Sequence, residues 1–588
     1  LEFIFQVRNA LHNIARKKLD QVTFDILPDL SSKLGFKNKS RYTKDRQCMS
    51  KILSCLHIIH SFTATMVKKF TRQIIFEASN IPKLRKLRFK KNVYIINNTL
   101  YCSFYRKEQT LNSLLKELIE IPINVEKFDR SYIYYASRTK LPKVQTKEIK
   151  KSVKTILSKP NLYPLIKLIY NAGLFQAVLP STKKIIDQPQ FDGYHAHPVD
   201  IHSIKTLKFS QNIEDEYVKS IFNDLTNEQK ILVRLVAFFH DIGKGRTEDH
   251  HLVGEKLFKS MMKSFDFNEE FIKLGARLVR YHNMMSYMAT HEDIYSEKTI
   301  LNFTGLIKTK EALKLLYAVT YCDISAVGKN IFSSSTASLL KQLYLQSLPA
   351  FENEEFLNES KRRIAKQNTI KNLDRYKSLP YTLQKKIMYI ASNQIFLRLK
   401  AEDILDIAIK AKDVETYIYK IINDSQLTIR IIRKSPLNLG YLLGKLEFLN
   451  IAAMNIFKLY DNKKAFDISF SEKVTEEDLF FIEEIIKDSF DMSKTVITKT
   501  PIIKKADIRI DSNHTAYLAS MHIIAKDQKG LFAYIAKIFD DFKIEIESAK
   551  LHTLNGYARD LILIEKNGNF CSKQEEIINL ICINDKEI

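Results

Sequence analysis

Residues 236–251, VAFFHDIGKGRTEDHH, constrain the fold of this chain more than any other stretch. An apolar segment with helical spacing, residues 231–239, ends directly in His240 and Asp241. Glycines, a lysine and two more histidines follow. Buried charge is costly unless it is paired or holds a metal. The segment is therefore either an exposed helix end or part of a metal site, and the rest of the sequence is needed to distinguish the two.

Two other apolar helical segments also carry side chains that bind metals. PVDIHSIKTL contains His202 among apolar neighbours, and ALKLLYAVTYCD ends in Asp323. Eight of the 14 histidines fall within 97 residues, where even scatter would place roughly two or three; they are His195, His197, His202, His240, His250, His251, His282 and His291. Histidine with carboxylate suits Mn, Fe, Zn or Mg-type ions. A lone histidine is more often a hydrogen-bonded core residue, but this combination favours a helical bundle with ligands that project inward.

Length and composition bound the class of protein. At 588 residues the chain is too long for one core, and two to four domains are expected. No window of about 18 uncharged apolar residues occurs, so we predict no transmembrane helix and no membrane partner. The opening residues, LEFIFQVRNALHNIARKK, have helical rather than signal-peptide character, and we expect a cytoplasmic location. Six scattered cysteines without C-x-x-C spacing indicate reduced thiols and argue against a cysteine zinc site.

The net charge of +25 raises the question of nucleic-acid binding. The lysines are spread along the chain, and no RNA-binding aromatic motif or zinc finger occurs. We therefore do not expect a nucleic-acid partner. Solvated basic faces, or an acidic or phosphate-bearing protein partner, account for the charge equally well.

The pattern of apolar residues divides the chain into a helical part and a mixed part. Helical spacing dominates to about residue 420, with one hairpin signal in NVYIINNTLYCS, where Asn97 and Asn98 form the turn. Two stretches of strand, helix, strand, strand and helix follow and repeat the same order. They predict two tandem βαββαβ-like units of about 65–75 residues each.

Several chemistries are excluded by the glycines. None of the 14 glycines is followed by Gly or Ser, and no G-x-G-x-x-G occurs. No Gly-Lys pair is followed by Ser or Thr. Dinucleotide fingerprints and P-loops are therefore absent, as is the Gly-Ser that opens a nucleotidyltransferase site. From this sequence alone we expect no nucleotidyl transfer.

The order His, His-Asp, Asp is the signature of the HD metal-dependent phosphohydrolases. FDGYHAHPVDIHS, FFHDIGKGRTEDHHLVG, VRYHNMMS and YCDISAVG resemble the HD domain of the bacterial PII uridylyltransferase/uridylyl-removing enzyme family. The start of the chain resembles that family's helical segment after the transferase domain, and the two repeats resemble its paired ACT domains. The resemblance implies a multidomain, mostly α-helical protein followed by two α+β ferredoxin-like ACT domains. The expected bounds are 1–190 for the helical domain, 191–330 for the HD domain, 331–420 for a helical connector, and 425–490 and 514–588 for the ACT domains.

Carried over residue by residue, the resemblance assigns roles in the HD domain. It makes His202, His240, Asp241 and Asp323 the ligands of a divalent ion, Mn or Mg, with Asp241 and Lys244 as the catalytic groups. It lets His250 and His282 bind a second ion, and it leaves His195 and His197 as orienting groups. The metal would activate water, and Lys244 would stabilise the negative transition state.

The sequence departs from the family's pattern near these residues. His197-Pro198 replaces a usual Tyr-Thr, Ile201 replaces an acidic residue before His202, and His251 stands where Ser is common. These departures leave the four expected ligands in place and alter the substrate side of the site.

The second repeat contains AKDQKGLF, which resembles the Asp-x-x-Gly-Leu turn where ACT domains bind an amino acid. We expect glutamine to bind at Asp527, Gly530 and Leu531, because Gly lets a backbone approach a ligand. The corresponding RKSPLNLG of the first repeat has no acidic residue. An ordinary strand–helix connection is the simpler interpretation of either turn.

The resemblance implies hydrolysis of the UMP–tyrosine bond on the uridylylated PII protein, with glutamine as the regulator. Two alternatives stay open: an HD phosphohydrolase that acts on a free nucleotide, such as an alarmone or cyclic dinucleotide, and a sensory scaffold without catalysis. The intact family enzyme also uridylylates PII with UTP, which requires a transferase domain upstream of the sequence given.

Overall fold

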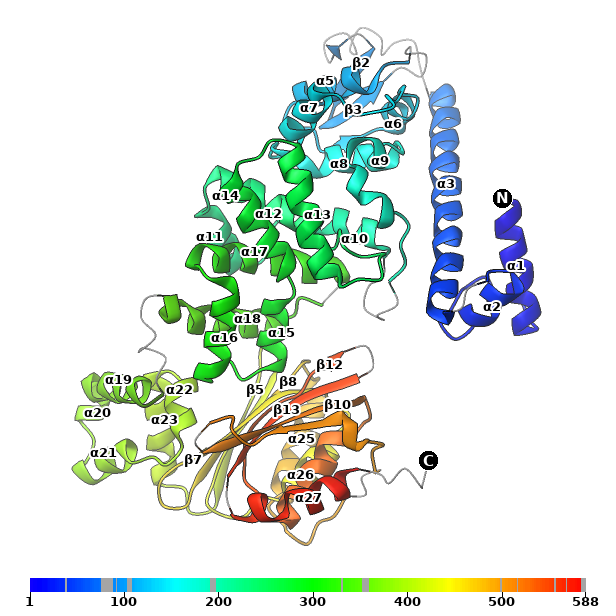
Figure 1. The fold of residues 1–588 in the computed structure, drawn as a ribbon. Helices are drawn as coiled ribbons and strands as arrows, with labels where there is room; N and C mark the ends of the chain where they lie inside the picture. The colour runs from blue at the N-terminus through cyan, green and yellow to red at the C-terminus, as the bar shows by residue number, and fades with distance from the viewer. Residues whose placement is uncertain are drawn as a thin grey trace. The chain divides into compact units, whose positions relative to one another are not determined.

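A computed structural model describes residues 1–37, 40–75, 88–90, 92–102, 108–190, 197–328, 331–351, 359–496, 500–515, 517–554, 557–566 and 568–582. The chain divides into two compact units (Figure 1). Unit 1 comprises Leu1–His282 and Glu311–Ile331, and unit 2 comprises Asn283–Lys310 and Phe332–Ile588. The described part is mostly helical, with a four-stranded and a nine-stranded sheet. No described helix is long and apolar enough to cross a membrane.

Unit 1 begins with three helices and a small sheet. The elements are α1 (Glu2–Ala15), α2 (Leu27–Lys33), α3 (Arg41–Ile75), β1 (Arg88–Lys90), β2 (Val93–Ile96), β3 (Thr99–Cys102) and β4 (Lys127–Phe128). The predicted hairpin is confirmed: β2 pairs with β3, and Asn97 and Asn98 have φ of 48° and 57°. Positive φ at both central residues is what a tight type I′ hairpin requires, and asparagine tolerates it.

Short helices lead from this sheet to the histidine-rich region. They are α5 (Leu111–Glu120), α6 (Arg130–Ser137), α7 (Lys147–Leu157), α8 (Leu162–Asn171), α9 (Phe175–Val178) and η2 (Pro180–Lys184). Thr110 and Thr146 cap α5 and α7 by accepting backbone hydrogen bonds from Ser113 and Ile149. Such caps satisfy amide groups that a helix leaves unpaired at its start.

The histidine-rich region is a helical bundle. Its helices in unit 1 are α10 (Val199–Gln211), α11 (Glu216–Asn223), α12 (Asn227–Phe239), α13 (His250–Ser264), α14 (Glu269–Arg280) and α17 (Lys310–Val327). The apolar segment expected at residues 231–239 forms the buried C-terminal part of α12, whose start is fixed by a capping box between Thr226 and Gln229. Gly275 lets α14 approach α13 and α12, because a Cβ there would lie 2.5 Å from Phe258.

The first helices of unit 2 come from two parts of the chain. They are α15 (Met284–His291), α16 (Glu297–Ile307), α18 (Ser334–Ser347), η3 (Leu348–Phe351), α19 (Glu359–Asn372), α20 (Asp374–Lys377), α21 (Tyr381–Met388), α22 (Asn393–Arg398) and α23 (Ala401–Lys412). Both α15 and α16 pack against α18. Residues 283–310, which we expected inside the HD domain, therefore share a compact unit with the C-terminal half of the chain.

The nine-stranded sheet contains both repeats. Its strands are β5 (Tyr417–Asn423), β6 (Leu427–Arg433), β7 (Ile451–Lys458), β8 (Lys464–Phe470), β9 (Ile508–Asp511), β10 (Leu518–Lys526), β11 (Ile546–Lys550), β12 (Thr553–Leu554) and β13 (Tyr557–Glu565). The order is β5-β6-β8-β7-β11-β13-β10-β9, with β12 beside β13. Antiparallel pairing of β7 with β11, such as Ala549 opposite Met454, joins the repeats into one sheet.

Helices α24 (Leu439–Lys445), α25 (Glu476–Asp488), α26 (Leu531–Asp541) and α27 (Gly568–Ile581) enclose one apolar core with this sheet, and α25, α26 and α27 are visible on one face in Figure 1. The connector helices α21–α23 form a second core with residues of β6, β7 and β8, including Ile432 and Phe457. The sheet of the first repeat is therefore covered on both faces.

The order of strands within each repeat differs from the expected βαββαβ. Each repeat is ββαββα: its edge strand, β5 or β9, precedes the first long strand and does not follow the second helix. The connector helix ends at Lys412 and not near residue 420, and both edge strands lie outside the expected bounds 425–490 and 514–588. An antiparallel edge can be filled from either end of the repeat, because a short connection reaches it in both cases.

Candidate metal centre

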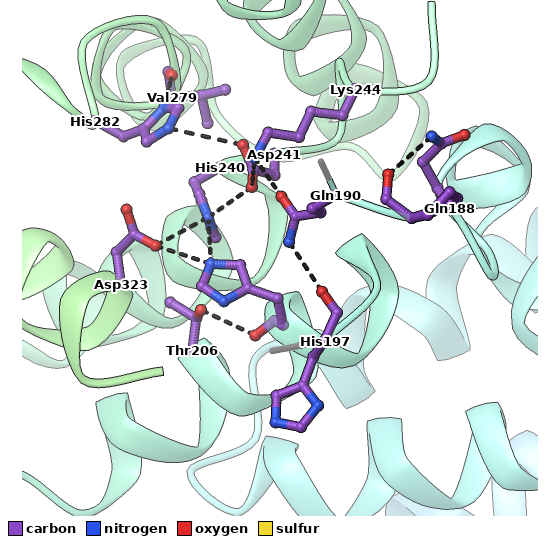
Figure 2. A network of polar contacts seen from close by, with 12 residues as sticks. Gln188, Gln190, His197, Thr206, His240, Asp241, Lys244, Val279, His282 and Asp323 are labelled. Carbon is purple, nitrogen blue, oxygen red and sulfur yellow. Dashed lines mark hydrogen bonds and ion pairs between the residues drawn. The ribbon is translucent and has the colours of Figure 1, made fainter. Parts of the chain in front are cut away.

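Four helices of unit 1 bring the predicted ligands to one point. His202 lies on α10, His240 ends α12 with Asp241 next to it, His282 follows α14, and Asp323 lies on α17. His202, His240, Asp241 and His282 are almost fully buried. The bundle with inward ligands that the sequence indicated is thus present in the geometry (Figure 2).

The ligand atoms lie close together. His202 Nε2 is 2.9 Å from Asp323 Oδ1 and 3.2 Å from His240 Nε2. His240 Nε2 is 3.3 Å from both Asp323 Oδ1 and Asp241 Oδ2. Nitrogen and oxygen donors at this spacing form the kind of set that holds one divalent ion.

Backbone carbonyls orient two of the imidazoles. His240 Nδ1 bonds to Ala237 O at 2.8 Å, and His282 Nδ1 bonds to Val279 O at 2.8 Å. When the Nδ1 of a neutral imidazole donates its hydrogen, Nε2 presents a lone pair. The Nε2 lone pairs then face the carboxylates, an arrangement that is repulsive unless a cation lies between them.

The electrostatics of the site indicate the same need. Burial would lower the pKa of His240, but the carboxylates of Asp241 and Asp323 outweigh it and raise that pKa to about 10. Burial would raise the pKa of the Asp241 carboxyl, but Lys244 and His240 outweigh it and hold that pKa well below the usual range. Burial is likewise outweighed at Asp323, where His240 and His202 hold the pKa of the carboxyl well below the usual range. A proton on His240 would thus supply the positive charge that a metal ion supplies better. The donor set fits a divalent cation.

Lys244 lies on the turn after α12 and reaches back to the site. Its Nζ is 2.7 Å from Asp241 Oδ2 and donates to Gln190 Oε1 at 2.6 Å, as Figure 2 shows. Gln190 in turn donates to the backbone carbonyl of His197 at 3.2 Å. Lys244 therefore places a cation beside the carboxylate.

Two glycines make this turn possible. A Cβ at Gly243 would lie 1.9 Å from the carbonyl oxygen of His250, so the turn and the start of α13 are in backbone contact. Gly245 has φ +80°, and a Cβ there would lie 2.4 Å from Lys184 O. The Gly-Lys-Gly sequence thus reflects close packing of the turn on both sides.

A second group of histidines lies at the start of α13. The ligand atoms of His250, His251 and His282 all lie within 4.8 Å of one another. The expected pair His250 and His282 is brought together, and His251, which we did not assign as a ligand, joins it. The adjacent His-His after the cap Asp249 was the available sequence signal.

The two histidines expected to orient the site have different outcomes. His195 lies outside the described residues. His197 contacts Lys205 through its ring and Gln190 through its carbonyl, and it is not in any candidate ligand group among the described residues. Gln190, which links His197 to Lys244, escaped the sequence analysis because glutamine carries no metal-binding signal.

The expected glutamine-binding turn lies in unit 2, between β10 and α26. Gly530 begins α26 with φ +79°, Leu531 is buried, and Asp527 is exposed. A Cβ at Gly530 would lie 3.1 Å from Glu447 Oε2, which belongs to the first repeat. In the first repeat, Lys434 is paired with Glu415 at 2.8 Å.

Comparison with known proteins agrees with this geometry. Residues 199–318 match the family model "HD domain", and residues 1–67 match "GlnD PII-uridylyltransferase". Three relatives are each named bifunctional uridylyltransferase/uridylyl-removing enzyme. The Zymomonas mobilis protein is 25% identical over 58% of this chain and 38% of its own length. The Ruegeria pomeroyi protein is 26% identical over 60% and 40%, and the Rhodopseudomonas palustris protein is 22% identical over 96% and 66%.

The alignment with the Rhodopseudomonas palustris protein extends over nearly the whole of this chain. This chain spans about 40% of the length of the Zymomonas mobilis and Ruegeria pomeroyi proteins. The match at residues 1–67 and the match over the bundle are separate in the sequence. The chain is thus similar to bifunctional uridylyltransferase/uridylyl-removing enzymes, and two of its segments match the GlnD PII-uridylyltransferase and HD domain models.

Proposed function

We propose that this chain removes UMP from a uridylylated tyrosine of a PII protein by metal-dependent hydrolysis. The observation that carries the proposal is the convergence of His202, His240, Asp241 and Asp323: His240 Nε2 lies 3.3 Å from both carboxylates, and His202 Nε2 lies 2.9 Å from Asp323. The names of the relatives supply the substrate, since each is a uridylyl-removing enzyme as well as a uridylyltransferase.

The four donors would hold the divalent ion, Mn or Mg, which supplies an activated water and neutralises phosphoryl charge. Hydrolysis would break the bond between phosphorus and the tyrosine oxygen, with the hydroxyl of water going to phosphorus and its proton to the tyrosine oxygen, so that UMP and free tyrosine leave. Lys244 is positioned to stabilise the negative charge that grows on the phosphoryl oxygens, because its ammonium lies 2.7 Å from Asp241. Gln190 fixes that ammonium from its other side.

We also propose that the two repeats are ACT domains and that glutamine binds at Asp527, Gly530 and Leu531. Gly530 begins α26, which is 11 residues long, with a positive φ that favours glycine. Asp527 would pair with the ligand's ammonium. Glu447, close to Gly530, adds a second carboxylate on the same side.

The direct test is incubation of the purified chain with uridylylated PII and Mn²⁺, with and without glutamine, followed by measurement of released UMP. Asp323→Asn serves as a control that removes a ligand without touching Lys244. Release of UMP that depends on Asp323 supports the proposal. Hydrolysis of an alarmone or a cyclic dinucleotide, but not of uridylylated PII, would favour the free-nucleotide alternative, and inertness toward all three would favour a scaffold.

A further inference from the structure

The three histidines His250, His251 and His282 are close enough to share an ion. Their ligand atoms lie within 4.8 Å of one another. Two imidazole nitrogens on one metal, each about 2 Å from it, are about 3 to 4 Å apart. Small side-chain rotations therefore suffice to bring all three onto one ion.

Local structure explains why two adjacent residues point to the same place. Asp249 caps α13 and accepts hydrogen bonds from the amides of His251 and Leu252 at 2.7 and 3.3 Å. The close contact of Gly243 with the His250 carbonyl holds this first turn against the His240–Asp241 turn. The rings of His250 and His251 are 3.8 Å apart, and those of His251 and His282 are 5.0 Å apart.

Asp241 links this group to the first one. Its Oδ2 faces His240 Nε2 at 3.3 Å and Lys244 Nζ at 2.7 Å, while its Oδ1 is 3.8 Å from His282 Nε2. The two oxygens of one carboxylate thus face two different sets of nitrogens. A carboxylate in this position commonly bridges two ions.

We propose that His251 is a ligand of a second divalent ion, held by His250, His251 and His282 with Asp241 Oδ1 as the fourth donor. The inference rests on the metal-dependent function proposed above and deepens it by naming the ligand set of the second ion.

Three imidazoles and one carboxylate make a site richer in nitrogen than the first. Imidazole suits Zn, Fe, Co and Ni, whereas Mg prefers oxygen donors. The second site is therefore selective for transition metals. A second ion beside the first supplies a further positive charge for the phosphoryl oxygens.

For the test, the full chain is first stripped of metal and then dialysed to equilibrium against Co²⁺. The number of Co²⁺ ions bound to each chain is then measured. We expect two ions for each wild-type chain and one for His251→Ser. His60→Ser is the matched control, because His60 is an exposed histidine of α3 in the same unit. It retains two ions.

A spectroscopic variant reports the ligand itself. In His251→Cys a thiolate takes the place of the imidazole, and a sulfur-to-cobalt charge-transfer band appears in the near ultraviolet as the second equivalent of Co²⁺ is added. This result does not require catalysis, so it stands even if the substrate proposed above is wrong. If His251→Ser does not fold, as judged by circular dichroism, the cysteine variant decides the question.

Two results would overturn the inference. One is a His251→Ser chain that still binds two ions with wild-type affinity, which would leave His251 as a packing residue. The other is a folded His251→Cys chain without the charge-transfer band. Loss of the first ion in Asp323→Asn, with the second retained, separates a failure of the first centre from a failure of this one.

Discussion

The two units each bury a cluster of charged side chains, and the clusters are built on opposite principles. In unit 1 the metal cluster, His202, His240, Asp241, His282 and Asp323, collects lone pairs around two carboxylates. In unit 2 the ionic cluster, Asp293, Arg398, His514 and Lys550, surrounds one carboxylate with basic groups. The side chains of Asp241 and Asp293 are both nearly inaccessible to water.

The ionic cluster is complete within the protein. Asp293 pairs with Arg398 at 3.5 Å and with His514 at 3.3 Å. Lys550 donates to the carbonyl oxygens of Ala289 and Glu292 at 3.3 and 2.8 Å. A cation at the last carbonyls of a helix is favourable. The cluster therefore joins the end of α15 to α22 and to the C-terminal repeat.

The metal cluster, by contrast, faces its two carboxylates mainly with histidines. Lys244 is the only Lys or Arg paired with its carboxylates among the described residues. The difference suggests how to separate the two kinds of cluster: the carboxylate of the ionic cluster is paired with fixed basic groups, whereas those of the metal cluster face imidazoles that can also bind an ion. Replacing one carboxylate in each cluster should therefore have different consequences.

The largest effect is expected from Asp241→Asn. The amide removes one negative charge and a carboxylate that contacts both groups of histidines, so metal binding should be lost and hydrolysis should fall roughly a thousandfold or more. The fold should remain, because the bundle's apolar core is untouched. Single-turnover release of UMP from uridylylated PII, together with circular dichroism, would measure both. Near-normal rates in a folded variant would show that the metal assignment is wrong.

The opposite result is expected from Asp293→Asn. Removing one partner of a buried ion pair leaves uncompensated charge on Arg398, and the free energy of unfolding should fall by about 3 kcal/mol. Urea titration of the variant and the wild-type protein measures the difference in the free energy of unfolding. Lys298→Ala, which removes the exposed pair with Asp511, is the control and should change the unfolding free energy by less than about 1 kcal/mol. Equal changes in the free energy of unfolding for Asp293→Asn and Lys298→Ala would show that the ionic cluster does not stabilise the fold.

The same cluster predicts a pH dependence. Burial opposes the ionised form of Asp293, but His514 and Arg398 outweigh it and hold the pKa of its carboxyl below the usual value. A lowered folded-state pKa means that the unfolded chain binds more protons at acid pH, so this contribution to stability is present at neutral pH and lost as pH falls below about 4. Wild-type protein should therefore lose stability in that range more steeply than Asp293→Asn. Parallel slopes would contradict the prediction.

These clusters also show what the sequence could and could not reveal. His240 and Asp241 were predictable because a helix as apolar as α12 ends in charge, and the turn at Asn97 and Asn98 was predictable because few residues accept positive φ. Both signals are local. The ionic cluster escaped because Asp293 and Lys550 are far apart in sequence and each alone resembles an ordinary surface charge.

The same reason accounts for the errors in the fold. Whether the strand at a sheet edge comes before or after its repeat depends on packing between distant segments, so β5 and β9 were not placed. The grouping of α15 and α16 with unit 2 reflects their packing against α18, while the match to the HD domain model includes both helices, as we expected. The local pattern of apolar residues predicts that a helix forms, but it does not predict which distant segment the helix packs against.

A third, smaller effect follows from removing the metal. Binding to the folded state alone stabilises it, by about 2.7 kcal/mol when the free ion is at 100 times its Kd. Chelation should thus lower the melting temperature of the wild type and leave that of Asp241→Asn unchanged. The ionic cluster has no such requirement, so Asp293→Asn should respond to chelation as the wild type does. A chelator effect of equal size in Asp241→Asn would place the stabilising ion elsewhere.

The smallest effect is expected in the regulatory response, and it tests whether unit 2 carries the sensor. If glutamine binds at the turn of Asp527, Gly530 and Leu531, it must favour one of two arrangements of the chain, because equal affinity for both would shift nothing. A coupling of about 1–3 kcal/mol corresponds to a change in hydrolysis of about 5-fold to 150-fold.

Asp527→Ala should weaken glutamine binding and flatten this response, yet leave hydrolysis without glutamine unchanged. Asp527 is exposed, so its loss should not disturb the core of the repeat. Lys434→Ala in the turn of the first repeat is the matched control, since Lys434 is exposed and pairs with the exposed Glu415, and it should keep the wild-type response. Calorimetry of glutamine binding and a glutamine titration of UMP release measure the two quantities separately. An unchanged titration in Asp527→Ala, with a flattened one in Lys434→Ala, would move the sensor to the first repeat.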